Sequence, residues 1–410
     1  MQRMGKWSLW FARKASLAHM SLGGLGLFVV GCTTVVSGPT EQVGTSVSHL
    51  SLSCTPRAKI ETIRTSGDPF LHRTGHAVVR LEDDVYIARG VANDIDTQTN
   101  TFREDLLRLD PRGDDRATFE KLGESGSEIP GPLGYPCMVG DVSSDSLLLF
   151  GGAHYLFDLN PNFFASFTPS DRLWRYRVRA GEWTAIEPSG VRPGARNGCN
   201  AEFYKGSMYV FGGANRFLHL NNQLWRFDTE TETWTLLAPA SPLPPARFIG
   251  ATVLDRENGK IYLYNGLHAT ASGFRQLGDF WVYDIAANTW REIPATPTPP
   301  RAKGTFTLLT GPCDKKYLVY TGGNIENSVL CTGFDEMTTA TSEVWAFDLQ
   351  NETWQRLETV GTAPRLEFAG GATVGNRHYI AGGWFDVPDP VRICRQVWNE
   401  NVYELMLVDE

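Results

Sequence analysis

Short apolar and polar runs alternate along the chain, and they return several times in the same order. In residues 207–234 an apolar run is followed by two glycines, a polar stretch, a second apolar run with Trp-Arg-Phe-Asp, and a tryptophan. This order recurs in residues 147–183, 261–290 and 317–354, with a weaker copy before them and a shortened copy after them. Short apolar runs bounded by glycine and polar clusters predict β-strands. A recurring unit of this size indicates a repeat architecture.

Each copy predicts four strands, which we call a, b, c and d in chain order. Strand b precedes the glycine pair, strand c carries aromatic residues, and strand d has an aromatic residue three positions before an aliphatic one. The second glycine is present in all six copies, although Arg89 and Asn265 replace the first one in two of them. This indicates a positive φ or a close backbone approach at the second position. The strand d tryptophans are interpreted as packing between neighbouring sheets.

These features together resemble the kelch repeat, because a Pro-x-Arg turn also follows several d strands. The resemblance covers residues 59–410 and implies an all-β fold, a six-bladed kelch-like β-propeller of four-stranded antiparallel blades. The chain ends after strand c of the sixth copy, and residues 60–63 have the pattern of a strand d. We therefore expect the N-terminal strand to complete the C-terminal blade, which removes exposed strand edges.

The N-terminal residues have the composition of an export signal followed by a tether. Basic residues precede the apolar run 21–30, which is too short to span a bilayer and ends in Val-Val-Gly-Cys. This resembles a bacterial lipobox with Cys32 as the lipidated residue; the alternative is an ordinary signal peptide. We expect a lipoprotein signal peptide in residues 1–31 and a Ser/Thr/Gly-rich tether in residues 32–58. Thr33 after the cysteine implies anchoring at the outer membrane, facing the periplasm or the cell surface.

Charge and motif content narrow the class of function. The chain of 410 residues has a formal net charge of −8, which argues against a nucleic-acid partner because phosphate binding needs a basic face. No phosphate loop, Ser-His-Asp motif or calcium loop appears. Some kelch propellers are copper oxidases, but their tyrosine, cysteine and histidine set cannot be assembled here. We expect no cofactor, no metal, a monomeric state, and membrane contact only through the lipid anchor.

Candidate binding residues come from loops that should share one face. In an antiparallel blade the b–c and d–a loops leave on the same side, and the b–c loops are the long ones, so we expect the site there. The residues that follow the glycine pair are Asn93, His154, Tyr155, Asn215, Arg216, His268, Asn324, Glu326, Trp384 and Asp386. The d–a turns add Arg73, Arg196, Arg247, Arg301 and Arg365.

The arginines and the aromatic residues each allow two interpretations. Arginines at the end of the channel suit an anionic ligand through bidentate contacts; alternatively they bind carbonyl groups of neighbouring loops, leaving one or two free. The loop of residues 153–170 carries five aromatic residues and forms either a rim for a partner or a cover on its own blade. His154 and His268 lack a third ligand of suitable spacing, so we expect no metal site.

Six cysteines other than Cys32 permit disulfides in an exported chain. The predicted faces favour Cys331–Cys394 in adjacent b–c loops and Cys137–Cys199 in adjacent a strands. Cys54–Cys313 is left as the third pair. Free buried thiols are the alternative for Cys137 and Cys199.

The expected function is that of a non-catalytic binding module of the bacterial cell envelope, which recognises a protein or glycan partner through its b–c loops. The alternative is an enzyme acting on an acidic sugar, by analogy with kelch-type sialic acid mutarotases. In that case Arg196 or Arg247 would hold the carboxylate, and Glu326 or His154 would move the proton. Because the fold does not decide between them, the geometry of the loop face must.

Overall fold

The computed structural model describes residues 54–94, 97–111, 113, 115–156, 163–270, 273–294, 300–326, 338–388 and 394–409. In these ranges β-strands dominate, beside a short helix α1 (Phe163–Ser166) and the 3-10 turns η1 (Val142–Ser144) and η2 (Pro312–Asp314). Among these residues, no helix combines the length and the apolar character needed to span a bilayer.

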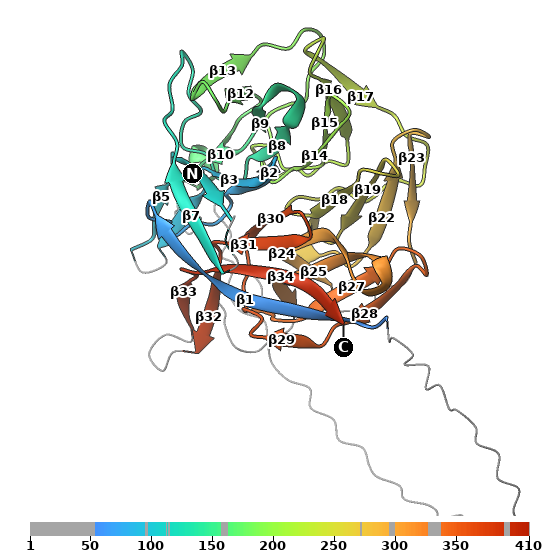
Figure 1. Cartoon of the computed structure of the whole chain (residues 1–410). Helices are drawn as coiled ribbons and strands as arrows, with labels where there is room; N and C mark the ends of the chain where they lie inside the picture. Colours follow the sequence, from blue (N-terminus) through green and yellow to red (C-terminus); the bar gives the residue numbers. More distant parts are fainter. Residues whose placement is uncertain are drawn as a thin grey trace, which may run out of the picture. The chain divides into compact units, whose positions relative to one another are not determined.

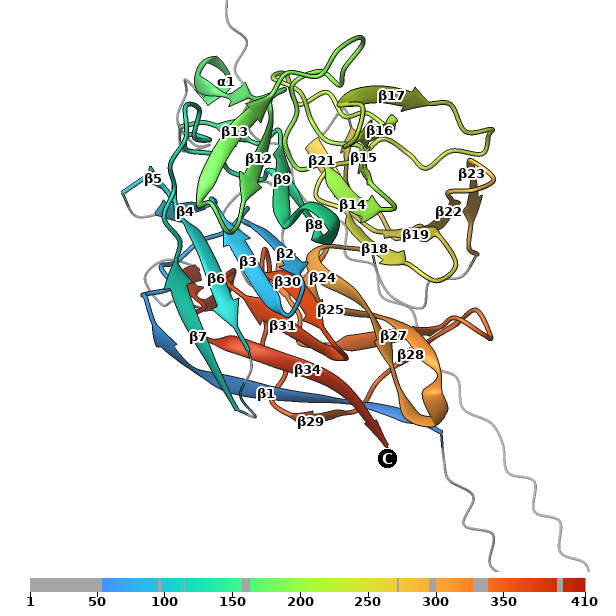
Figure 2. The ribbon, with the colours of Figure 1, turned by 45° about the horizontal axis from the view of Figure 1, so that its top comes forward.

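Six four-stranded antiparallel blades form a propeller, as the sequence predicts (Figure 1). The strands of each blade are given in order from strand a to strand d. Blade 1 contains β2 (Ala77–Leu81), β3 (Asp84–Ala88), β6 (Leu106–Asp110) and β7 (Arg116–Lys121), and blade 2 contains β8 (Cys137–Asp141), β9 (Ser146–Phe150), β12 (Leu173–Arg177) and β13 (Glu182–Ile186). Blade 3 contains β14 (Asn200–Tyr204), β15 (Ser207–Phe211), β16 (Leu224–Asp228) and β17 (Thr233–Leu237). Blade 4 contains β18 (Ala251–Asp255), β19 (Lys260–Tyr264), β22 (Phe280–Asp284) and β23 (Thr289–Glu292). Blade 5 contains β24 (Arg301–Thr310), β25 (Lys316–Glu326), β27 (Val344–Asp348) and β28 (Thr353–Arg356). Blade 6 contains β30 (Gly370–Val374), β31 (Arg377–Ala381), β34 (Val402–Asp409) and β1 (Pro56–Gly67). The six a strands converge at the centre, each beside the next (Figure 2).

The N-terminal strand β1 closes the ring. It pairs antiparallel with β34, from Pro56 opposite Asp409 to Ile63 opposite Val402. Its inward-facing side chains Ala58 and Ile60 are buried in the core that blades 5 and 6 share. The prediction that the N-terminal strand completes the C-terminal blade is therefore confirmed.

Parallel pairing along the outer rim joins neighbouring blades at five of the six connections. Beyond residue 63, β1 continues beside β7 of blade 1, while β29 (Thr359–Gly361) runs parallel to the beginning of β1. Similar parallel bridges join Ser125 to Glu182, Ser189 to Thr233 and Ala240 to Thr289. In these five connections the chain that leaves a d strand therefore reaches the d strand of the following blade; residues 295–299, between blades 4 and 5, are not described.

The glycine pair is left-handed at both positions in all six blades. The second glycine has φ between 77° and 117°, and the first position has φ between 52° and 72°. A Cβ atom at Gly151 would lie 2.5 Å from the Arg196 carbonyl oxygen of the next blade. Positive φ and close approach both favour glycine here, as predicted. Arg89 and Asn265 occupy the first position, which has the smaller φ.

The strand d tryptophans lie between blades. Trp234 of blade 3 packs on Phe150 of blade 2 with ring centroids 5.2 Å apart, and Trp290 of blade 4 packs on Phe211 of blade 3 at 5.3 Å. Trp183 is fully buried in the core that blades 1 and 2 share. These contacts confirm that the tryptophans pack between the sheets of neighbouring blades.

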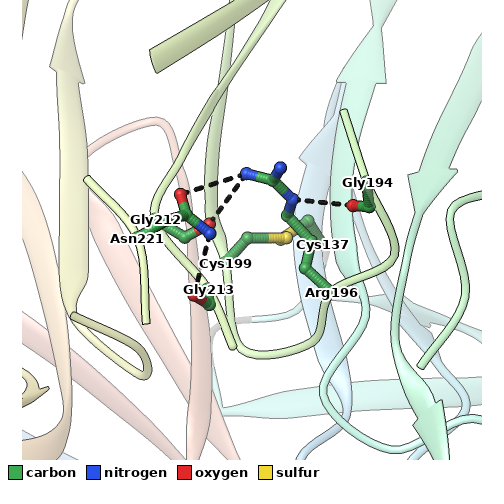
Figure 3. The surroundings of a disulfide bond; sticks show 7 residues. All are labelled: Cys137, Gly194, Arg196, Cys199, Gly212, Gly213 and Asn221. Carbon is green, nitrogen blue, oxygen red and sulfur yellow. Dashed lines mark hydrogen bonds between the residues drawn. A yellow bond between two sulfur atoms is a disulfide. The ribbon is translucent and has the colours of Figure 1, made fainter. Parts of the chain in front are cut away.

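Two disulfides link distant parts of the propeller, and both join expected pairs. Cys54 bonds to Cys313 with the Cα atoms 5.6 Å apart, and Cys137 bonds to Cys199 at 5.9 Å. The second bond joins the a strand of blade 2 to the segment entering blade 3 (Figure 3). Cys331 lies outside the described residues, so its pairing with Cys394 stays a prediction.

Candidate functional site

The b–c loops form β-hairpins on one side of the propeller, which we call the hairpin face. The hairpins are β4 (Val91–Asp94) with β5 (Thr99–Phe102), β10 (Ala153–His154) with β11 (Thr168–Pro169), β20 (Leu267–Thr270) with β21 (Gly273–Gln276), the end of β25 with β26 (Thr338–Ala340), and β32 (Trp384–Pro388) with β33 (Cys394–Trp398). In blade 3 a turn closes with a bridge between Ala214 and Leu220. The residues after each glycine pair therefore share one face, as expected.

Four of the five candidate arginines are engaged in internal contacts, which agrees with the interpretation that they bind groups of the protein itself. Arg73, Arg247 and Arg301 are no more than 1% exposed and form ion pairs with Asp105, Asp279 and Glu343 of their own blades. Arg196, 3% exposed, donates to the carbonyl oxygens of Gly194 and Gly212 and to the side chain of Asn221 (Figure 3). It also donates to the side chain of Gln223. Burial lowers the pKa of Arg196 to about 10, which leaves it charged at neutral pH.

The fifth arginine, Arg365, is exposed but does not occupy the equivalent position. The bridge between Glu367 and Trp384 corresponds to the bridge between Phe248 and Leu267 in blade 4, which aligns Leu366 with Arg247. Leu366 is buried in the apolar core of blades 5 and 6. Arg365 is therefore a surface residue rather than a member of the repeated arginine set.

The sequence contains a pattern that indicates the structural role of these arginines. Each repeated arginine is paired with an acceptor residue that directly precedes strand c of the same blade. In three blades this acceptor also binds the indole N–H of the tryptophan two residues later. Asp279, for example, accepts from Arg247 at 2.8 Å and from the indole N–H of Trp281 at 2.7 Å.

In blade 2, where Leu133 replaces the arginine, the acceptor position holds Arg172. In blade 6, where Leu366 replaces the arginine, this position holds Asn401. The four blades with arginine therefore have Asp, Glu or Gln at this position, and the two leucine blades do not.

The other predicted site residues on the hairpin face have mixed roles. Asn215 caps its own turn by accepting from the N–H groups of Phe217 and His219, while Arg216 is exposed and donates to the Ala165 carbonyl at 3.4 Å. His268 places Nδ1 2.6 Å from the Ala246 carbonyl oxygen. The structure describes the backbone of Glu326 in β25 but not its side chain.

The aromatic loop of blade 2 folds inward where it is described. Tyr155 and Phe167 are buried together with Val91 of the neighbouring hairpin. His154 is exposed and stacks on Phe102 with ring centroids 4.7 Å apart. Asn93 is partly buried, and its Oδ1 atom has no hydrogen-bond partner among the described residues. Phe157 and the side chains of Phe163 and Phe164 lie outside the described part of the chain. For the described aromatics, the cover interpretation holds.

Six residues at one equivalent position surround the end of the central channel on this face. Five of them lie two residues before the first residue of strand a, and the sixth, Lys303, lies near the beginning of the longer β24. All have φ between 51° and 66°, and they are Gly75, Tyr135, Gly198, Ile249, Lys303 and Phe368. Backbone hydrogen bonds join them from blade to blade, such as Ile249 N–H to the Gly198 carbonyl at 2.8 Å and Phe368 N–H to the Lys303 carbonyl at 2.8 Å. We call this set the mouth ring. Left-handed backbone is costly for residues other than glycine, and most of all for a β-branched one such as Ile249.

An aromatic cluster extends from the mouth ring across blades 6 and 1. Phe368 contacts Tyr135 and Trp384 edge to face with ring centroids 5.7 Å apart in each pair. Trp384 contacts Trp398 across the hairpin at 5.3 Å, and His72 stacks on Trp398 at 5.5 Å. The tryptophans are partly exposed. Of these residues the sequence singled out only Trp384. The signal for Tyr135 and Phe368 was an aromatic residue where other copies have glycine.

Charged and amide groups lie beside this cluster. The Lys303 amine is 4.5 Å from the centre of the Phe368 ring and 3.5 Å from a Glu367 carboxylate oxygen. Glu367 is 4% exposed and also accepts from the Asn324 amide at 2.7 Å. Both donors contact the same carboxylate oxygen, Oε2, so this buried charge has a cation and an amide beside it. No group of three or more His, Cys, Asp or Glu side chains suited to a metal occurs among the described residues.

Comparison with known proteins agrees with this architecture. Residues 142–383, more than half of the chain, match the model of the KLHDC2/KLHL20/DRC7 Kelch-repeats domain. The chain belongs to the kelch-repeat family. Among kelch relatives, it is 24% identical over 346 residues to kelch domain-containing protein 10 of Xenopus tropicalis, covering 78% of this chain and 77% of that protein. It is 27% identical over 199 residues to kelch domain-containing protein 3 of Homo sapiens, covering 47% and 48%.

A solved structure shows the same fold as this kelch propeller. The structure of YjhT superposes with a TM-score of 0.58 at 16% sequence identity, covering 81% of this chain and 94% of that one. At this identity the likeness concerns the fold alone. The function of this kelch protein must be argued from its own side chains.

Proposed function

We propose that the protein is a non-catalytic binding module whose hairpin face contacts a protein partner. The observation that carries the proposal is the distribution of exposed and half-exposed aromatic groups on this face. Phe217, at the tip of the blade 3 turn, is 66% exposed. The cluster of Trp384, Trp398 and His72 lies in blades 6 and 1, on the other side of the mouth ring. Aromatic side chains are enriched in protein interfaces.

The separation of these groups favours a protein over a small glycan. Blade 3 and blade 6 stand opposite each other in a six-bladed ring, so a partner that covers both must span the channel end. A protein interface of ordinary size can do so, whereas a single sugar stacks on one aromatic group. The mouth ring beneath is joined by backbone hydrogen bonds, which gives the partner a preorganised floor.

The hypothesis of an enzyme that acts on an acidic sugar depends mainly on free arginines, and the two arginines it needs are engaged. Arg196 and Arg247, which would hold the carboxylate of such a substrate, are buried and bound to the protein's own acceptors. Releasing either one would leave an unpaired group in the interior. The described part of the hairpin face therefore offers no converging set of free arginines and carboxylates.

The test is photo-cross-linking of the intact protein on bacterial envelopes, with single substitutions on each face. We expect Phe217→Ser and Trp384→Ala each to abolish a specific cross-linked product. The matched control is Val142→Ser, because Val142 is 57% exposed in η1 on the opposite face. Loss of the product in Val142→Ser with retention in the other two would reject the hairpin face. Displacement of the product by free glycans would identify a glycan partner instead.

We also propose that the propeller is held at the bacterial envelope by a lipid on Cys32. The support is the basic, apolar and Val-Val-Gly-Cys order of the first residues together with two disulfides, which suit an oxidising compartment.

A further inference from the structure

The six a strands surround a central cavity of about 570 Å³. Its lining begins one residue past the mouth ring, at positions such as His76, Cys199 and Gly304, and reaches Arg80, Glu257 and Lys316 at the a–b turns. The lining therefore runs the length of the inner strands. Because Glu257 is largely exposed, this end of the cavity meets solvent on the face opposite the hairpins.

Side chains of the mouth ring cover the other end. A Cβ atom at Gly75 would lie 2.8 Å from the Tyr135 ring, and one at Gly198 would lie 3.2 Å from Ile249 Cγ1. Each of these large residues thus leans over the glycine of the preceding blade. Tyr135 also reaches Phe368, which the Lys303 amine covers. A small solute therefore has its route to the cavity on the a–b side.

Hydroxyl groups and a neutral imidazole line the wall between blades 5 and 6. His378 Nδ1 lies 2.9 Å from the Thr373 hydroxyl, and Nε2 lies 3.1 Å from the Thr305 hydroxyl. The Thr373 hydroxyl in turn meets that of Thr307. Burial lowers the pKa of His378 to about 3, so the imidazole is uncharged at neutral pH. This wall offers donors and acceptors without a formal charge.

Glu202 supplies the carboxyl group of the blade 3 wall. It is partly exposed, and burial raises its pKa to about 7, while a hydrogen bond from Thr252 and the charge of Arg256 act in the opposite direction. Near neutral pH much of this side chain is a neutral carboxylic acid that both donates and accepts. Its neighbours in the cavity again include threonine hydroxyls.

The formal charges at the solvent end are engaged with the protein. Lys316 forms an ion pair with Glu257, and Arg256 donates to the Phe203 carbonyl oxygen at 2.9 Å. Arg80 donates to the Glu82 carbonyl oxygen at 2.5 Å. Farther in, between this charged end and the mouth ring, a solute would meet mainly threonine hydroxyls, the neutral His378 imidazole and Glu202. Burying an unpaired charge in that inner part is expensive.

We propose that this cavity is a binding site for a small neutral polyhydroxylated molecule of monosaccharide size, entered from the a–b face. The volume is in the range of small-molecule sites, roughly 300–1,000 Å³. A neutral polyol exchanges hydrogen bonds with Thr305, Thr373 and Glu202 and places no charge in the interior. The site is separate from the hairpin face and does not depend on the function proposed for that face.

The test measures binding of D-glucose, D-galactose and myo-inositol to the intact protein by saturation-transfer NMR and by thermal shift, up to about 100 mM because a 1 mM Kd is then exceeded ~100-fold. D-glucuronate and D-glucosamine are the matched charged probes. We expect saturable binding of at least one neutral probe and a higher Tm, with weaker binding of both charged probes. Absence of saturable neutral binding, or tighter binding of a charged probe, would overturn the proposal.

Two variants locate the site. Thr373→Val and Glu202→Leu should each weaken binding of the neutral probe about tenfold or more, since each removes a hydrogen-bonding group from the wall. Val191→Ser, at a 76% exposed position in the connection between blades 2 and 3, should leave this binding unchanged. If either wall variant fails to fold, the other still decides. Unaltered affinity in a folded wall variant would exclude the cavity.

Discussion

At the scale of single residues, one position of the repeat carries different chemistry in different blades. Arginine stands at the d–a turn of blades 1, 3, 4 and 5, whereas Leu133 and Leu366 stand there in blades 2 and 6. Each arginine is buried with an acceptor from its own blade, so it is part of the interior rather than a ligand group. In the two leucine blades only the arginine is replaced by an apolar residue, because the acceptor position holds Arg172 in blade 2 and Asn401 in blade 6.

The arginine and its acceptor should therefore be strongly coupled. Arg247→Ala leaves Asp279 and its buried surroundings without a counter-ion, and we expect the free energy of unfolding to fall by about 3–5 kcal/mol. Arg247→Leu combined with Asp279→Asn should recover part of that loss, because no unpaired charge remains. Urea unfolding gives both values. Arg365→Ala, the exposed control, should change stability by less than about 0.5 kcal/mol. Equal effects of Arg247→Ala and Arg365→Ala would contradict the buried ion pair.

Glu202 predicts a pH dependence of stability with a definite sign. Its pKa is raised from 4.5 to about 7, so the folded protein holds this proton where the unfolded chain has lost it. The contribution of Glu202 to the free energy of unfolding should then fall as the pH rises from 4.5 to 7, by at most about 3 kcal/mol. His76 and His378, with pKa values lowered to about 3, act oppositely below pH 6.5. The free energy of unfolding in urea is measured at each pH for the native protein and for Glu202→Gln, and their difference gives the effect of the carboxyl group. If the two free energies change with pH in parallel, Glu202 has no such role.

At the scale of elements, β1 depends on more partners than any ordinary strand d. It pairs with β34 along most of its length, with β29 at its beginning and with β7 at its end. The disulfide from Cys54 to Cys313 ties its first residues to η2 in the a–b turn of blade 5. Blades 5, 6 and 1 are therefore held together through one strand.

The two disulfides should contribute unequally to stability. Cys54–Cys313 spans 259 residues and Cys137–Cys199 spans 62, so the first bond restricts the unfolded chain more. On loop length alone, replacing both cysteines by serine should cost about 1 kcal/mol more for the first pair than for the second. Urea unfolding of the two double variants, beside the native protein under oxidising conditions, measures this difference. A larger loss for the Cys137/Cys199 variant would contradict the argument from loop length.

At the scale of the whole molecule, the propeller presents two faces with different chemistry. The hairpin face has partly exposed aromatic groups around a covered channel end, and the opposite face has the solvent end of the cavity. Closure by β1 pairs the open edge of β34, which protects the ring from edge-to-edge aggregation. A large partner and a small solute can thus bind without competing for one surface.

The envelope proposal predicts that location depends on one residue while folding does not. Cys32→Ser should abolish incorporation of labelled fatty acid and move the protein from the membrane fraction to the soluble fraction. The Tm of the propeller should stay unchanged, because Cys32 precedes the first described strand. Cell fractionation with a fatty-acid label decides the question. Membrane retention of Cys32→Ser without label would reject the lipid anchor.

The sequence by itself determined the number of blades, the strand order, the left-handed glycine position and the strand that closes the ring. These features follow from hydrophobic alternation and from backbone φ, which act between residues that are near in the chain or equivalent in the repeat. Tertiary structure decided which side chains are free. Only the closed ring brings His76 to the Ala381 carbonyl across 305 residues, or Tyr135 to Phe368 at the mouth ring. A repeat fixes where each backbone lies, but these side-chain contacts join different blades, and no local pattern contains them.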